Sequence, residues 1–255
     1  MATLSKAPKV KPSGQLMSDK REIRGQVWTA IKLAGAGRFP GIRGRIPNFV
    51  GAEAAAKQLQ STSEWLAATH VKFNPDSPQR PLRRAALVAG KTIFMAVPKL
   101  TELKPFIMLD PTLIDPKDYW RASSIKGAFE LGLPIAIESM PRIDLIVTGC
   151  VAVSEDGTRL GKGGGYSDLE YGLLKEAKKI DDSTPVVTSL HSTQLLESGA
   201  LPRDVHDVTI DVVALPDCIR RISSDAPKSP GIIWSILPDE KRNAIPILRD
   251  WVSTP

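Results

Sequence analysis

The chain has 255 residues, 42% hydrophobic and 24% charged, and a formal net charge of +6. Its apolar content excludes disorder as the main state, and its two cysteines are too few for a disulfide-stabilised scaffold. The charge is uneven, because residues 1–50 hold ten Lys or Arg against Asp19 and Glu22 while the remainder is close to neutral. A basic N-terminal region on a near-neutral body indicates a local anion site or a nucleic-acid-binding arm.

Several classes of partner are not expected. The most apolar stretch, residues 85–97, is too short to span a bilayer and contains Lys91. Aromatic residues make up only 5% and do not alternate with basic ones, so a nucleic-acid partner is not expected. The N-terminus has no apolar core typical of a secretory signal. We therefore expect a cytoplasmic protein, monomeric or homodimeric, that acts on a small molecule.

The chain begins with a segment that lacks a periodic apolar face. Residues 1–17 contain Pro8, Pro12 and Gly14, and are expected to form a flexible basic tail before a single domain over residues 18–255. Ser18 is a suitable N-cap for the first helix. The apolar face of that helix is expected to consist of Ile23, Val27, Ile31 and Ala34.

The rest of the chain alternates short apolar runs with helical patterns, which indicates an α/β fold with a mostly parallel sheet. The expected strands are residues 69–73, 92–97, 134–137, 144–153, 185–190 and 209–215. Helices are expected over residues 116–131 and 166–180. After Pro227 the pattern weakens to a strand at residues 232–236 and a terminal helix at residues 243–251.

A glycine-rich segment is the most informative stretch of the sequence. It reads Arg159-Leu160-Gly161-Lys162-Gly163-Gly164-Gly165-Tyr166-Ser167-Asp168, between an expected strand and an expected helix. Successive backbone N–H groups that lead into a helix N-terminus can bind an anion, and Arg159 and Lys162 add positive charge. We favour phosphate binding over a flexible surface turn. The segment matches neither a Walker A loop nor a dinucleotide-binding fingerprint.

Two further features are ambiguous from local chemistry. Asp168 is either a Mg²⁺ ligand beside a bound phosphate or a first-turn aspartate that interacts with the helix dipole. Lys20 and Arg24 repel one another at i,i+4 spacing near a helix N-terminus. Either neighbouring acidic side chains or a bound polyphosphate would relieve that repulsion.

These residues carry a resemblance to a known family. The segment 159–168 resembles the signature of the 5-formyltetrahydrofolate cyclo-ligase (methenyltetrahydrofolate synthetase) family, and Lys20-Arg-Glu-Ile-Arg24 resembles its N-terminal basic motif. Gln194 and His206-Asp-Val-Thr-Ile-Asp211 resemble its C-terminal block. Four further segments resemble the methenyltetrahydrofolate synthase domain-containing branch: Ile46-Pro-Asn-Phe49, Val151-Ala-Val-Ser154, Asp168-Leu-Glu-Tyr171 and Ile245-Pro-Ile-Leu-Arg249.

The resemblance implies a three-layer α/β sandwich that uses ATP and Mg²⁺ to close 5-formyltetrahydrofolate to 5,10-methenyltetrahydrofolate, with release of ADP and phosphate. It places Lys20 and Arg24 on the ATP phosphates, residues 159–167 around the nucleotide, and Asp168 and Asp207 on Mg²⁺. Lys162, Arg159 and Arg24 are the residues it implies for catalysis, and Tyr166 is placed near the folate.

The sequence departs from the family pattern at Ser167 and Leu169, where the family has a second tyrosine and an arginine. For the folate-contacting glutamate, Glu53 and Glu64 are the candidates. Two alternatives therefore stay open: an ATP-using enzyme that acts on a non-folate, thiamine-related heterocycle, and a non-catalytic nucleotide- or RNA-binding protein.

Overall fold

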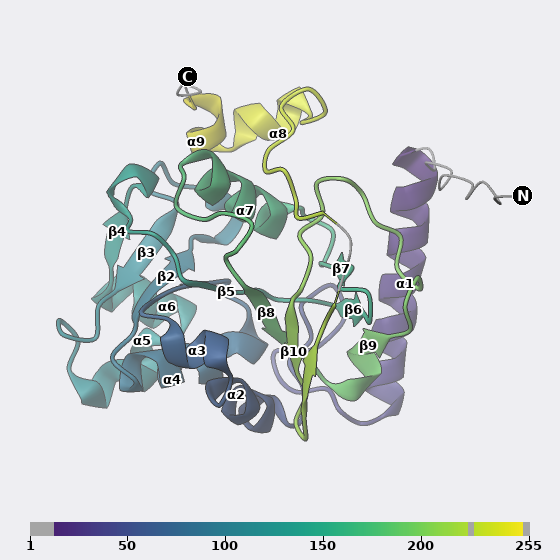
Figure 1. The fold of residues 1–255 in the computed structure, drawn as a ribbon, viewed down its shortest axis with the longest axis horizontal. Helices are drawn as coiled ribbons and strands as arrows, with labels where there is room; N and C mark the ends of the chain where they lie inside the picture. The colour runs from purple at the N-terminus through teal and green to yellow at the C-terminus, as the bar shows by residue number, and fades with distance from the viewer. Residues whose placement is uncertain (1–12, 224–226, 252–255) are drawn as a thin grey trace, which may run out of the picture.

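An eight-stranded sheet forms the centre of the computed structural model, which describes residues 13–223 and 227–251 (Figure 1). The strand order is β11-β10-β8-β5-β1-β2-β3-β4, with parallel pairing from β10 to β2 and antiparallel pairing at both edges. In chain order the strands are β1 His70–Phe73, β2 Thr92–Ala96, β3 Phe106–Leu109, β4 Leu133–Ile135, β5 Leu145–Val147, β8 Val186–Ser189, β10 Val212–Ala214 and β11 Ile219–Arg221.

Helices cover both faces of this sheet, which confirms the expected three-layer α/β fold (Figure 1). On one face lie α2 Ala52–Gln60, α3 Ser63–Ala67, α4 Arg80–Val88, α5 Tyr119–Ala122 and α6 Ile125–Leu131. The other face carries α7 Tyr166–Glu176, α8 Asp239–Ala244 and α9 Pro246–Arg249. Short 3-10 turns lie between them at Ser77–Gln79, Pro98–Leu100, Pro116–Asp118, Ile137–Ser139 and Ser192–Gln194.

The side-chain alternation of the strands separates two hydrophobic cores. In β2, Ile93 and Met95 pack with the α2–α6 layer, whereas Phe94 and Ala96 pack with the α7 layer. All four are no more than 1% exposed. Strands buried on both faces explain why these runs are almost continuously apolar.

A second, three-stranded sheet supports the N-terminal helix. It consists of β6 Ala152–Ser154, β7 Arg159–Leu160 and β9 Leu195–Leu196, in the order β7-β6-β9. Helix α1, Ser13–Leu33, packs against this sheet through Val27 and Ile31, which contact a cluster containing Val151 and Leu160. Figure 1 shows α1 at the edge of the molecule, beside β6, β7 and β9.

Two expectations about the ends of elements were wrong. Helix α1 begins at Ser13, so Ser18 lies inside the helix and does not cap it, and residues 13–17 belong to the helix rather than to a tail. The rest of the expected tail, residues 1–12, lies outside the described residues. The single helix expected over residues 116–131 is divided, because Ser124 accepts a hydrogen bond from Gly127 N–H and begins α6.

The expected strand at residues 144–153 is also divided, between β5 of the large sheet and β6 of the small one. The chain turns away from the large sheet at Gly149, whose N–H donates to Asn74 Oδ1 over 3.0 Å. A Cβ on Gly149 would lie 2.6 Å from Asp76 Oδ2, so the close approach requires glycine. Residues 232–236 form no strand, with a turn at residues 234–236, and β3 was not predicted.

Candidate functional site

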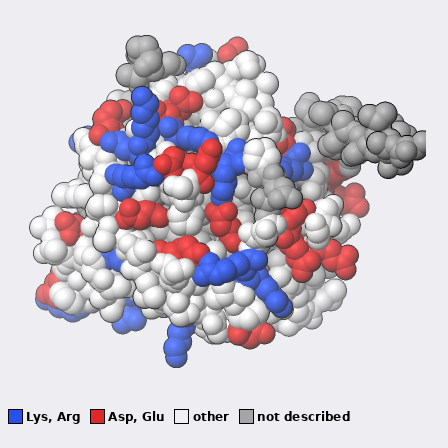
Figure 2. Space-filling view, in the orientation of Figure 1, with Lys and Arg blue, Asp and Glu red and all other residues white. Residues whose placement is uncertain are grey.

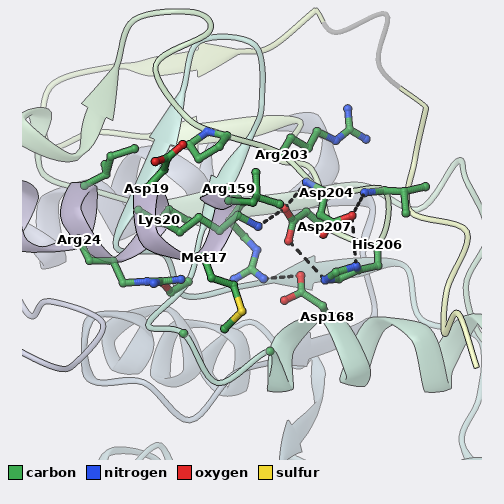
Figure 3. Close-up of a pocket in the computed structure, with 18 of the residues that line it drawn as sticks. Met17, Asp19, Lys20, Arg24, Arg159, Asp168, Arg203, Asp204, His206 and Asp207 are labelled. Carbon is green, nitrogen blue, oxygen red and sulfur yellow. Dashed lines mark hydrogen bonds and ion pairs between the residues drawn. The ribbon is translucent and has the colours of Figure 1, made fainter. Parts of the chain in front are cut away.

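A cavity of about 1500 Å³ separates α1 from the segment that follows β7. Its walls come from α1, the glycine-rich loop (residues 161–165), the loop at residues 199–207 and a C-terminal segment at residues 231–241. The predicted site residues that line it are Lys20, Arg24, Arg159, Leu160, Gly161, Gly163, Gly165, Asp168 and Asp207. Four parts of the sequence that are far apart therefore meet around one space. Figure 3 labels side chains from α1, from residues 159–168 and from residues 203–207.

Helix α1 supplies two cations to the cavity. Lys20 and Arg24 are one turn apart and so lie on the same face of the helix. Lys20 Nζ lies 2.5 Å from Asp207 Oδ2, and Arg24 Nε donates to the Gly161 carbonyl oxygen over 2.6 Å. Burial lowers the pKa of Arg24, although the charge of Asp207 opposes this. Contacts across the cavity thus hold two like charges on α1 in place.

The glycine-rich loop approaches these cations closely because it lacks side chains there. Gly163 has φ 104° and Gly165 has φ 66°, which L-residues with a side chain rarely adopt. A Cβ on Gly163 would lie 3.4 Å from Arg24 Cζ. Gly165 directly precedes α7, so the loop ends at a helix N-terminus as predicted.

Arg159 and Asp168 form a buried ion pair across the base of the loop. Arg159 Nη2 lies 2.5 Å from Asp168 Oδ1, which also accepts from the Val208 N–H over 3.2 Å. Burial would raise the pKa of Asp168, but the Arg159 guanidinium outweighs it and the pKa lies below its usual value. The pKa of Arg159 is raised, because the charge of Asp168 outweighs the effect of burial, which would lower it. Both groups are therefore charged at neutral pH.

Asp207 lies close to this pair. Its Oδ2 accepts from Lys20 and from the Asp204 N–H over 2.7 Å, and His206 Nε2 lies 3.9 Å from its Oδ1 (Figure 3). Val208, the next residue, binds Asp168. The two carboxylates predicted to bind a metal are thus brought to one cavity.

The side chains around the cavity can be compared with the ligands that a divalent cation requires. Within residues 13–223 and 227–251, no group of three or more His, Cys, Asp and Glu side chains is arranged to hold a metal alone. Mg²⁺ commonly takes only one or two carboxylates, with waters and substrate phosphates completing the shell. Asp168 and Asp207 fit that mode of binding.

The remaining predicted residues lie outside the cavity lining. Lys162 Nζ donates to Asp76 Oδ1 over 3.2 Å, and Ser167 Oγ accepts from Asn74 Nδ2 over 3.2 Å. Gly164 presents its carbonyl oxygen to Lys241 Nζ, and Tyr166, the first residue of α7, is partly buried against the core on that side of the sheet. The folate candidates Glu53 and Glu64 pair with Arg38 and Arg221 and do not line the cavity.

Behind the loop lies a buried polar group, which we call the rear cluster: Lys72, Asn74, Asp76 and Glu170. Lys72 Nζ and Asn74 Nδ2 each lie 2.5 Å from Glu170 Oε2, and Lys72, Asn74 and Glu170 are at most 3% exposed. Burial raises the pKa of Glu170, and the charge of Lys72 opposes this. The sequence did not reveal this cluster. A lysine within the apolar strand run at residues 69–73 was its one available signal.

Charge on the visible surface is mixed. Figure 2 shows Lys and Arg side chains intermingled with Asp and Glu on the face turned to the viewer. In the part of the chain that the structure describes, no helix is long and apolar enough to cross a membrane.

Comparisons with known proteins identify the family of the chain. Residues 16–216 match the model of the 5-formyltetrahydrofolate cyclo-ligase family. The chain is 35% identical over 233 residues to a methenyltetrahydrofolate synthase domain-containing protein of Bos taurus, and 34% identical over 233 residues to that of Homo sapiens. These matches cover 90% of this chain but 61% and 60% of the relatives, so the chain spans about three fifths of their length.

Among solved structures, the chain is similar to a 5,10-methenyltetrahydrofolate synthetase of Aquifex aeolicus, with a TM-score of 0.49 and 22% identity over 81% of this chain and 94% of that one. The family match includes Lys20 and Arg24 of α1, the whole glycine-rich loop, and the carboxylates Asp168 and Asp207. On this sequence match the chain belongs to the 5-formyltetrahydrofolate cyclo-ligase family.

Proposed function

We propose that this chain uses ATP and Mg²⁺ to convert 5-formyltetrahydrofolate to 5,10-methenyltetrahydrofolate, ADP and phosphate. The observation that carries the proposal is the convergence of Lys20, Arg24 and Arg159 on a glycine-rich loop that ends at a helix N-terminus. Such an arrangement is suited to a polyphosphate. Family membership then supplies the reaction and the second substrate.

In the proposed reaction, the formyl oxygen on N5 attacks the γ-phosphorus of ATP, and the bond to the ADP oxygen breaks. N10 then attacks the activated carbon, loses its proton, and the carbon–oxygen bond to phosphate breaks. Arg24 and the loop N–H groups would hold the phosphates in line, and Arg159 would keep Asp168 ionised and oriented. Mg²⁺ held by Asp168 and Asp207 would neutralise charge on the phosphate oxygens.

The test is the absorbance of methenyltetrahydrofolate, followed with purified protein, 5-formyltetrahydrofolate, ATP and Mg²⁺. We expect a rise that requires all three additions and that Asp168→Asn abolishes. Asp181→Asn is the matched control, because Asp181 is half exposed and pairs with Arg142 away from the cavity. A flat trace from a protein that binds ATP would contradict folate chemistry and leave only the nucleotide site.

A second candidate is ATP-dependent turnover of another small heterocycle. It is favoured by Glu53 and Glu64 lying outside the cavity lining, and by Ser167 contacting Asn74 at the rear of the loop. Release of ADP with a nitrogen heterocycle, but not with 5-formyltetrahydrofolate, would support it. ADP release that depends only on the folate would eliminate it.

A further inference from the structure

The C-terminal wall of the cavity lies outside the part of the chain that matches the family model. That match ends at residue 216, whereas residues 231–241 contribute Ile232, Ile233, Leu237 and Lys241 to the lining. Three of these four side chains are apolar. The wall thus carries one cation on an otherwise apolar surface.

The ammonium group of Lys241 contacts the glycine-rich loop. Its Nζ donates to the Gly164 carbonyl oxygen over 2.6 Å and lies 5.2 Å from the centre of the Tyr166 ring. A Cβ on Gly165 would lie 2.8 Å from Lys241 Nζ, so the loop leaves room for the ammonium group. Burial lowers the pKa of Lys241, while the charge of Asp168 opposes that shift.

Lys20, Arg24, Arg159 and Lys241, which line the cavity near the loop, fall into two pairs. Lys20 and Arg159 are ion-paired with Asp207 and Asp168. Among the described residues, Arg24 and Lys241 form no ion pair with a carboxylate, and each donates instead to a loop carbonyl, of Gly161 or of Gly164. An ammonium group has three donors and a guanidinium five, so both retain donors for a ligand. A partly buried cation without a counter-charge is stabilised when an anion arrives.

We propose that Lys241 is a phosphate-binding residue, which the C-terminal segment adds to the nucleotide site opposite Arg24. The inference rests on the proposed function in that the ligand is a nucleotide polyphosphate. It assigns a binding residue that the family motifs do not contain. The apolar side chains beside Lys241 would cover the ligand and strengthen the charge interaction by excluding water.

The test measures binding by calorimetry with Mg-ATP, AMP and inorganic tripolyphosphate as separate probes. The variants are Lys241→Met and Lys241→Arg. Lys126→Met is the control, because Lys126 is 90% exposed on α6. We expect Lys241→Met to weaken ATP and tripolyphosphate about tenfold or more, and AMP less than threefold, because a charge-assisted hydrogen bond to the polyphosphate is lost. Lys241→Arg should recover most of the loss.

The outcomes separate this inference from the proposed function. If the wild-type protein binds neither ATP nor tripolyphosphate, both are overturned. If it binds both and Lys241→Met binds them equally well, only the role of Lys241 is overturned. An equal loss for ATP and AMP would also overturn it, because a lysine that merely shapes the wall does not distinguish the number of phosphates. Lys241→Gln, checked by thermal melting, replaces Lys241→Met if that variant does not fold.

Discussion

The two sides of the glycine-rich loop differ in how their charges are satisfied. On the rear side, Lys72, Asn74 and Glu170 are almost fully buried and bonded to one another. On the cavity side, the hydrogen bonds of Arg24 and Lys241 to described residues go to backbone carbonyls of the loop. One side fixes the position of the loop and of α7, and the other keeps donors for a ligand. This division explains how a loop with four glycines in five positions can form a defined site.

The largest expected effect is a loss of protein stability when the rear cluster is disrupted. Lys72→Met or Glu170→Leu alone should lower the free energy of unfolding by about 3–5 kcal/mol, because each leaves a buried charge without its partner. The double variant should lose less than either single variant. Urea unfolding measures all three. Single variants within 1 kcal/mol of the wild type would show that the rear cluster does not hold the loop.

On the cavity side we expect the reverse, a loss of turnover without a loss of stability. Arg24→Met should reduce turnover on the order of a hundredfold, because it removes a donor to the transferring phosphoryl group. Its unfolding free energy should change by less than about 1 kcal/mol, since the half-buried guanidinium forms no ion pair with a carboxylate among the described residues. Arg21→Met, an exposed neighbour on α1, is the control for general charge. Equal turnover in the two variants would contradict the comparison.

The smallest expected effect concerns how readily a thiol reagent reaches the rear side of the loop. Cys150 follows Gly149, is 1% exposed, and burial raises the pKa of its thiol to about 11. Cys218 is only partly buried. At pH 8 a thiol reagent should therefore modify Cys218 quickly and Cys150 only as the protein opens. Cys218→Ser identifies the fast thiol, and two fast thiols would mean that the rear side is open to solvent.

Sequence reasoning located most of the large sheet and the start of α7, because buried parallel strands and a glycine loop before a helix leave strong local patterns. It failed where tertiary contacts decide. No local pattern shows that Gly149 passes Asp76 and moves the chain from one sheet to another. The apolar run at residues 232–236 resembles a strand, but it ends in a turn at residues 234–236 and pairs with no strand among the described residues.

The same limit applies to the site. The sequence motifs identified Lys20, Arg24, Arg159, Asp168 and Asp207, and the structure brings them to one cavity. Lys241 belongs to no motif, and its contacts with Gly164 and Tyr166 distinguish it from the exposed lysines. The side of the loop that Lys162 faces likewise depends on Asp76, which is 86 residues away.

The packing of α1 also has a consequence for synthesis on the ribosome. Val27 and Ile31 are made early, but Val151, Leu160 and Leu201 of the same cluster follow more than a hundred residues later. At 5–20 residues per second, the apolar face of α1 therefore waits on the order of ten seconds for these partners. During that interval strands β1 to β5 of the large sheet emerge, so that part of the sheet can begin to form before α1 has all of its packing partners.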